Sequence, residues 1–81
     1  MNRYRVLLFA RYAELLGAEQ IEVVLPDGAS VADLTTALRV LPGGGLLPPQ
    51  PLVAVNLRQA PPGTPLQPTD QIAVLPPLAG G

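Results

Sequence analysis

The chain has 81 residues, a formal net charge of −1, and neither cysteine nor histidine. This length suits one domain, and the missing residue types exclude disulfides, zinc sites and thiol redox chemistry. The nearly balanced charge attracts neither nucleic acid nor anionic lipid, and no apolar run is long enough for a membrane span of roughly 20 residues or for a secretion signal, so we expect a cytoplasmic protein.

The N-terminal third of the sequence predicts two strands around a short helix. Residues 3–9 carry apolar side chains on both alternating sides, which is typical of a strand inside a sheet. Residues 10–16 predict a helix of about two turns, because apolar residues recur at helical spacing and Gly17 can supply a left-handed cap. The apolar face of that helix is expected to comprise Phe9, Ala13 and Leu16. Residues 20–25 alternate between apolar and polar side chains, as in a half-buried strand.

The clearest helix in the sequence begins after Ser30. Ser30 is a favourable N-cap, and Asp33 three positions later gives a capping-box pattern near the positive end of the helix. Pro42 and the glycine run at 43–45 end this helix. Its predicted apolar stripe, which is expected to pack on the sheet, comprises Val31, Leu34, Leu38 and Leu41.

The second half of the sequence predicts two further strands separated by irregular segments. Residues 46–51 are expected to form a connector, and residues 52–55 a strand that is apolar almost throughout. Proline and glycine exclude long regular structure between residues 60 and 69, and residues 71–75 form the last strand before a diproline. This order of elements predicts an α+β fold, in which one main helix crosses a small mixed sheet and a short helix is added.

The C-terminal residues carry the chemistry that the rest of the chain lacks. Without histidine, cysteine or lysine there is no obvious general base for neutral pH, no thiolate and no Schiff-base amine, so the chain is not expected to catalyse a reaction alone. We divide it into a domain at 1–75 and an extended tail at 76–81. Six residues in polyproline II conformation reach about 18 Å, which would carry the Gly81 carboxylate into a partner's active site. Gly80 has no side chain to obstruct a narrow channel; the alternative is an ordinary frayed terminus.

Apolar residues around the last strand are predicted to contact a partner. The chain has few charges and 48% apolar residues, more than so small a core needs, and exposed apolar patches usually mark interfaces. The alternative places the single phenylalanine in the core. The predicted docking residues are Phe9, Leu75, Pro76, Pro77 and Leu78.

Several motifs give the chain a family resemblance. They are the segments 6–10 (VLLFA), 14–17 (ELLG), 30–34 (SVADL), 53–56 (VAVN), 70–77 (DQIAVLPP) and the final Gly80-Gly81. Through these motifs the sequence resembles the molybdopterin synthase small subunit, in the MoaD family of ubiquitin-like sulfur carriers, over nearly its whole length. The most specific motif is the last strand that runs into Pro-Pro and Gly-Gly. The resemblance implies a ubiquitin-like β-grasp fold with a flexible C-terminal Gly-Gly tail.

The resemblance also implies a function and partners. In that family an E1-like adenylyltransferase uses ATP to adenylate the terminal glycine, here Gly81, and a sulfur-donor protein converts the acyl-adenylate into a thiocarboxylate. The carrier then inserts its tail into the large subunit of molybdopterin synthase, which moves the sulfur onto a pterin precursor. The chain would be the non-catalytic subunit of this sulfurtransferase complex, with no cofactor and no metal of its own.

Other uses of the same carboxylate stay open. A carrier of this kind also suits sulfur transfer to thiamine or to a thiolated tRNA base, and a ubiquitin-like modifier or a plain interaction module uses the same fold. Two positions depart from the MoaD pattern. Ala13 stands where an arginine often precedes the glutamate of the short helix, and Thr69 stands where a glycine often precedes the aspartate of the last strand. These departures affect the expected contacts with the partner.

Overall fold

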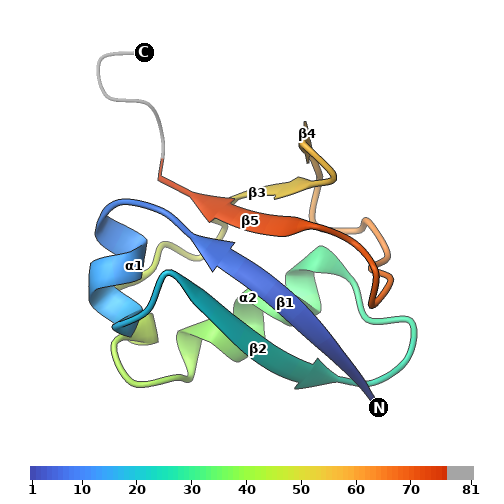
Figure 1. Cartoon of the computed structure of the whole chain (residues 1–81), viewed down its shortest axis with the longest axis horizontal. Helices are drawn as coiled ribbons and strands as arrows, with labels where there is room; N and C mark the ends of the chain where they lie inside the picture. Colours follow the sequence, from blue (N-terminus) through green and yellow to red (C-terminus); the bar gives the residue numbers. More distant parts are fainter. Residues whose placement is uncertain (77–81) are drawn as a thin grey trace.

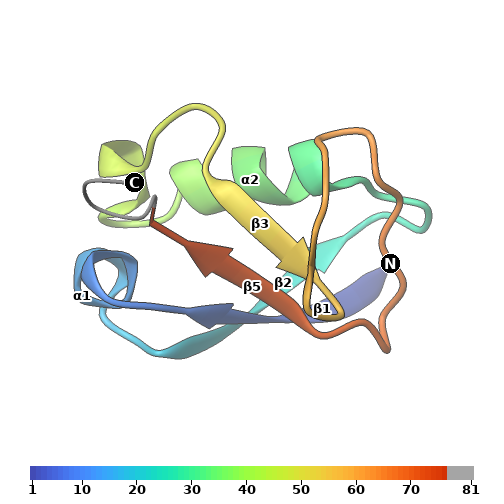
Figure 2. The same cartoon turned by 90° about the horizontal axis from the view of Figure 1, so that it is seen from above.

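The computed structural model describes residues 1–76, which form strands, two α-helices and a short 3₁₀ helix (Figure 1). In chain order the elements are β1 (Asn2–Leu8), α1 (Arg11–Leu16), β2 (Gln20–Leu25), α2 (Val31–Arg39), the 3₁₀ helix η1 (Gly44–Leu46), β3 (Leu52–Val55), β4 (Arg58–Gln59) and β5 (Ile72–Leu75). Within these residues the five strands form one sheet in the order β2-β1-β5-β3-β4, and α2 packs across one of its faces (Figure 2). No helix in this part of the chain has the length and apolar character needed to cross a membrane.

The first and last strands pair inside the sheet. β1 runs parallel to β5, with Leu8 opposite Val74. β2 pairs antiparallel with β1, and β3 pairs antiparallel with β5. The carboxyl ends of β1 and β5 therefore lie together, at the end of the sheet that carries α1 (Figure 1). The mixed sheet crossed by one main helix confirms the predicted α+β architecture.

The core lies between the sheet and α2. The helix contributes Val31, Leu34 and Leu38, each at most 3% exposed, which confirms three members of its predicted stripe. The predicted capping box is also present, because the Asp33 N–H donates to Ser30 Oγ (3.3 Å) and the Ser30 N–H donates to the Asp33 carboxylate (2.9 Å). The sheet side of the core comprises Tyr4, Val6, Leu8, Val23, Leu25, Val53, Ile72 and Val74.

Leu41 does not belong to the buried stripe, contrary to the prediction. α2 ends at Arg39, with Val40 as its C-cap. The proline at position 42 disfavours helical backbone at the residue before it, so the chain leaves the helix before Leu41 and that side chain is 37% exposed. Leu47, which follows η1, joins the core instead and is 2% exposed.

The buried face of α1 also differs from the prediction. Tyr12 is the buried residue of this helix, whereas Ala13 and Leu16 are only partly buried against the core. β1 ends at Leu8, so Phe9 lies outside both the strand and the helix. A tight turn at Ala10 exposes Phe9.

Two short elements, η1 and β4, are absent from the predicted order. β4 pairs with β3 through a two-residue turn at Asn56 and Leu57, which both have positive φ (53° and 70°), as in a type I′ hairpin. η1 belongs to the glycine run. A Cβ at Gly43 would overlap the Leu15 carbonyl, and one at Gly44 would overlap the Leu38 carbonyl. Glycine therefore lets this loop pack closely against both helices.

Replacement of Tyr4 by phenylalanine is expected to stabilise the domain. Tyr4 is 1% exposed, and its hydroxyl has no hydrogen-bond partner among the described residues. A buried polar group without a partner costs about 1–3 kcal/mol, so Tyr4→Phe should raise the free energy of unfolding in urea by about 1 kcal/mol. Tyr12→Phe is the control, because the hydroxyl of Tyr12 is not a buried unpaired group. A lower unfolding midpoint for Tyr4→Phe would mean that an ordered water satisfies this hydroxyl in solution.

Candidate functional site

The C-terminal tail leaves the domain from a strand inside the sheet. β5 lies between β1 and β3, and its last residue, Leu75, pairs with Leu52 of β3. Pro76 follows directly and is half-buried. Because proline has no N–H to donate to the sheet, the strand ends there. Four predicted site residues lie outside the described part of the chain, and their roles stay predictions: Pro77, Leu78, Gly80 and Gly81.

Phe9 is exposed at the same end of the sheet, directly after β1 and beside the end of β5. A tight turn directs it there. The Tyr12 N–H donates to the Phe9 carbonyl (3.1 Å), and Ala10 takes φ 50° and ψ −127°, a conformation that favours glycine. Phe9 is 44% exposed as a result, so the alternative that places it in the core is wrong.

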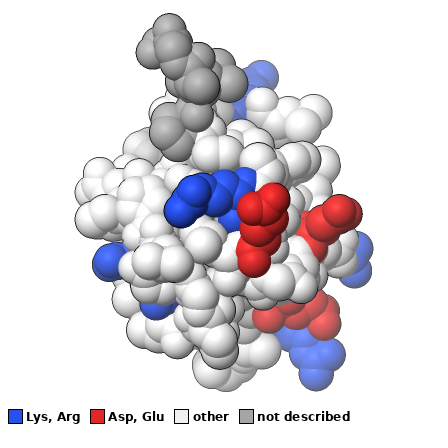
Figure 3. All heavy atoms as spheres, turned by 90° about the vertical axis from the view of Figure 1, so that its left-hand side faces the viewer, with Lys and Arg blue, Asp and Glu red and all other residues white. Residues whose placement is uncertain are grey.

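A hollow of about 670 Å³ adjoins Phe9, between the end of β1, α1 and the start of β2. Leu7, Leu8 and Ala13 supply apolar lining, and Glu14 stands among its polar residues. Figure 3 faces this end of the molecule and shows a largely uncharged surface, with acidic and basic side chains gathered across its middle. An apolar hollow beside an exposed aromatic ring is suited to receive a side chain of a partner protein.

The face of the sheet opposite α2 carries further apolar side chains. Successive residues of a strand point to opposite faces, so the neighbours of the buried positions on β1, β3 and β5 point to this uncovered face (Figure 2). The apolar side chains among them are half-buried. We call this set the open-face patch, and it comprises Leu7, Leu52, Ala54, Ala73 and Leu75.

The open-face patch and Phe9 form one continuous surface around the base of the tail. Leu7 belongs to the patch and also lines the hollow beside Phe9. Leu75 belongs to the patch and directly precedes Pro76. The fold thus brings together the three predicted docking residues that lie in the described part of the chain. This surface offers a partner an apolar binding site, and a partner bound here lies next to the point where the tail begins.

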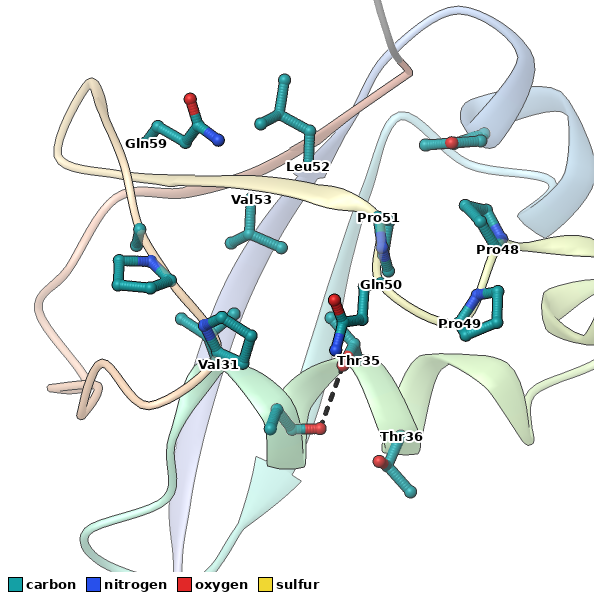
Figure 4. Close-up of a pocket in the computed structure, with 15 residues that line it drawn as sticks. Val31, Thr35, Thr36, Pro48, Pro49, Gln50, Pro51, Leu52, Val53 and Gln59 are labelled. Atoms are coloured by element: carbon teal, nitrogen blue, oxygen red, sulfur yellow. Dashed lines mark hydrogen bonds between the residues drawn. The ribbon is translucent and has the colours of Figure 1, made fainter.

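A separate hollow of about 640 Å³ lies between α2 and two proline-rich segments (Figure 4). Pro48, Pro49 and Pro51 stand on one side of it, and Thr35 of α2 stands on the other, where its hydroxyl donates to the Ala32 carbonyl (3.0 Å). No described residue of β1 or β5 lines this hollow. Leu52 of β3 belongs both to its lining and to the open-face patch, so the hollow adjoins the surface around the tail at that residue.

Comparison with known families places this surface and the tail in context. The model of the ThiS family matches residues 6–81, a range that includes both terminal glycines. The chain belongs to the ThiS family. No curated protein matches this ThiS-family chain significantly.

Solved structures with the same fold include molybdopterin converting factor subunits and a small archaeal modifier protein. SAMP1 of Haloferax volcanii, a small archaeal modifier protein, is 27% identical with a TM-score of 0.81, over 99% of this chain and 100% of SAMP1. A Pyrococcus furiosus protein assigned as molybdopterin converting factor subunit 1 is 26% identical with a TM-score of 0.81, over 96% of this chain and 100% of that protein. A complex of subunits 1 and 2 of molybdopterin-converting factor from Helicobacter pylori shares the fold, at 22% identity and a TM-score of 0.69, over 98% of this chain and 99% of that one.

These likenesses confirm two predictions. The ThiS-family chain has the ubiquitin-like β-grasp fold. It also belongs with the sulfur carriers and ubiquitin-like modifiers, as its resemblance to the MoaD family implied.

Proposed function

We propose that this chain is a sulfur carrier in molybdenum cofactor biosynthesis. An E1-like adenylyltransferase joins the Gly81 carboxylate to the AMP moiety of ATP and releases pyrophosphate. A sulfur-donor protein then supplies sulfide equivalents that displace AMP, which leaves a thiocarboxylate on Gly81. The large subunit of molybdopterin synthase receives the tail and moves this sulfur onto a pterin precursor. The chain is the small, non-catalytic subunit and binds no cofactor itself.

The observation that carries the proposal is the family match, which runs through to Gly81. The likeness to the Pyrococcus furiosus protein supports a pterin as the acceptor. The chemistry of the chain is consistent with this role, because a protein without cysteine carries transferable sulfur only on an acquired group. The surface formed by Phe9 and the open-face patch supports it too, since a partner that binds there lies beside the start of the tail.

Intact-protein mass spectrometry tests the proposal. After incubation with ATP, an E1-like enzyme and a sulfur donor, the chain is expected to gain the mass that corresponds to sulfur in place of one oxygen, and fragmentation should place this change at Gly81. The matched control omits ATP, without which no acyl-adenylate forms. The thiocarboxylated chain is then mixed with a synthase large subunit and the pterin precursor. If the chain gains sulfur but no molybdopterin forms, the chain is a sulfur carrier whose acceptor is not the pterin precursor.

The likeness to SAMP1 favours a second candidate, a protein modifier. In that function the activated Gly81 forms an isopeptide bond with a lysine of another protein. The chain has no lysine of its own, so it could not extend into lysine-linked polymers. Conjugates that carry the C-terminal residues of the chain on target lysines, found by proteolysis and mass spectrometry, would support this candidate.

A further inference from the structure

The open face of the sheet has a basic end. Arg3 and Arg5 are exposed residues of β1, and they share a face with Leu7 because residues two apart in a strand point the same way. All three line a hollow of about 510 Å³ beside the loop that precedes β5. Since Leu7 is also part of the open-face patch, the two arginines continue the surface around the tail toward the other end of the sheet.

Neither guanidinium group forms an ion pair within the described domain. Glu22 stands opposite Arg5 in the register of β1 and β2. However, no arginine within residues 1–76 has a carboxylate oxygen within 4.0 Å, and the ion pair found there joins the N-terminal amine to Asp27. Arg3 stands opposite Val24, which offers no charge. Within residues 1–76, an acidic group from outside would therefore displace no ion pair of Arg3 or Arg5.

The other carboxylate of this hollow has structural partners. Asp70 accepts hydrogen bonds from the Asn56 side-chain amide (3.0 Å) and from the Gln67 N–H (2.8 Å). The Gln71 N–H in turn donates to Asn56 Oδ1 (2.9 Å). Asp70 is thus engaged in holding the loop before β5 against the β3–β4 turn, whereas Arg3 and Arg5 have no side-chain hydrogen-bond partner among residues 1–76.

We propose that Arg3 and Arg5 bind carboxylates on the same protein partner that covers the open-face patch. The inference rests on the proposed function, because it concerns the E1-like enzyme that must hold the chain while its tail is adenylated. Two residues along a strand are separated by about 6.8 Å, so each guanidinium can bind its own aspartate or glutamate, with bidentate geometry. A protein surface fits better than a free phosphate. The basic end continues into apolar side chains, and phosphate offers nothing to pack against them.

Association kinetics with the E1-like adenylyltransferase test this inference. At low ionic strength, Arg3→Gln/Arg5→Gln is expected to lower the association rate constant about tenfold and to flatten its dependence on salt, because surface charges of this kind act mainly on association. Glu22→Gln should have the opposite effect and raise the association rate constant about twofold, because it removes the negative charge that faces Arg5. Arg58→Gln is the matched control, since this exposed arginine of β4 does not line the hollow. Urea unfolding should be unchanged in all of these variants.

Each outcome decides between the possibilities. If Arg3→Gln/Arg5→Gln associates like the native chain with the same salt dependence, or if Glu22→Gln slows association, the inference is overturned. Inorganic phosphate should inhibit no more than chloride at equal ionic strength; stronger inhibition would make the hollow an anion site instead. If the E1-like enzyme neither binds nor adenylates the native chain, the proposed function itself is contradicted. If the enzyme binds the native chain and the arginine variant equally well, only the inference about Arg3 and Arg5 is contradicted.

Discussion

A chain that ends at Gly80 is expected to lose sulfur transfer while the domain keeps its stability. Each residue of an extended tail spans about 3.1 Å, and a misplacement of about 1 Å at a reacting centre already costs about 10² in rate. Removal of Gly81 therefore withdraws the carboxylate from the adenylating site and from the acceptor. One added residue moves the carboxylate too far and replaces the group that reacts. Stability is expected to stay the same, because the change lies beyond β5, which ends at Leu75.

Two measurements check this prediction. Mass spectrometry after the activation reaction reports sulfur on the terminus, and a pterin assay with the large subunit reports transfer. The variants to compare are the deletion of Gly81, the addition of one alanine after it, and the native chain, with urea unfolding as the control for folding. An extended chain that supported molybdopterin formation without being trimmed would show that Gly81 is not the working group.

Phe9→Asp is expected to weaken binding of the large subunit about thirtyfold or more and to leave the domain folded. An aromatic anchor in the middle of an interface typically contributes about 2 kcal/mol or more to binding, which is a factor of about 30 in Kd. The aspartate adds the cost of desolvating a charge beside the apolar hollow. In the free domain Phe9 is 44% exposed and lies outside β1, so the substitution leaves a solvated carboxylate and no cavity in the core.

Val40→Asp is the matched control for this experiment. Val40 is 80% exposed at the end of α2, and it belongs neither to the open-face patch nor to the hollow beside Phe9. The same apolar-to-acidic change is expected to leave binding unaltered there. Calorimetric titration gives the two Kd values, and urea unfolding gives the two stabilities. If Phe9→Asp unfolds the domain, Phe9 acts in folding and its contribution to an interface would have to be measured with Phe9→Ala.

The elements with strong local signals could be predicted from the sequence. The capping box at Ser30 and Asp33 sets the start of α2 whatever the rest of the chain does. The predicted strands at 20–25 and 52–55 have the bounds of β2 and β3, because their flanking turns and breakers are sharp. Gly17 caps α1 in the left-handed conformation, with φ 77°, as predicted. These signals are enough to give the α+β architecture.

The remaining errors concern features that depend on distant parts of the chain. Ala10 takes a conformation that favours glycine. Because the residue there is alanine, the local sequence did not indicate the turn that exposes Phe9. β4 has two residues, too few for any periodicity. The open-face patch joins Leu52 and Ala73 only because β3 and β5 are neighbours in the sheet. The alternation of apolar and polar residues within one strand does not indicate which strands are its neighbours. The docking surface was therefore predicted at the strand ends near the tail and missed in the middle of the sheet.

The pairing of β1 with β5 has a consequence for biosynthesis. The ribosome makes β1 first and β5 last, and the interior of the sheet requires both. A chain that stops before Ile72 lacks the strand between β1 and β3 and loses Ile72 and Val74, both 0% exposed. Such a chain cannot complete its core and is expected to be degraded as an unfolded protein. Folding therefore acts as quality control for β5: a molecule that reaches the folded state already holds the strand that presents the tail, and chains that stop before this strand are removed before they occupy a partner.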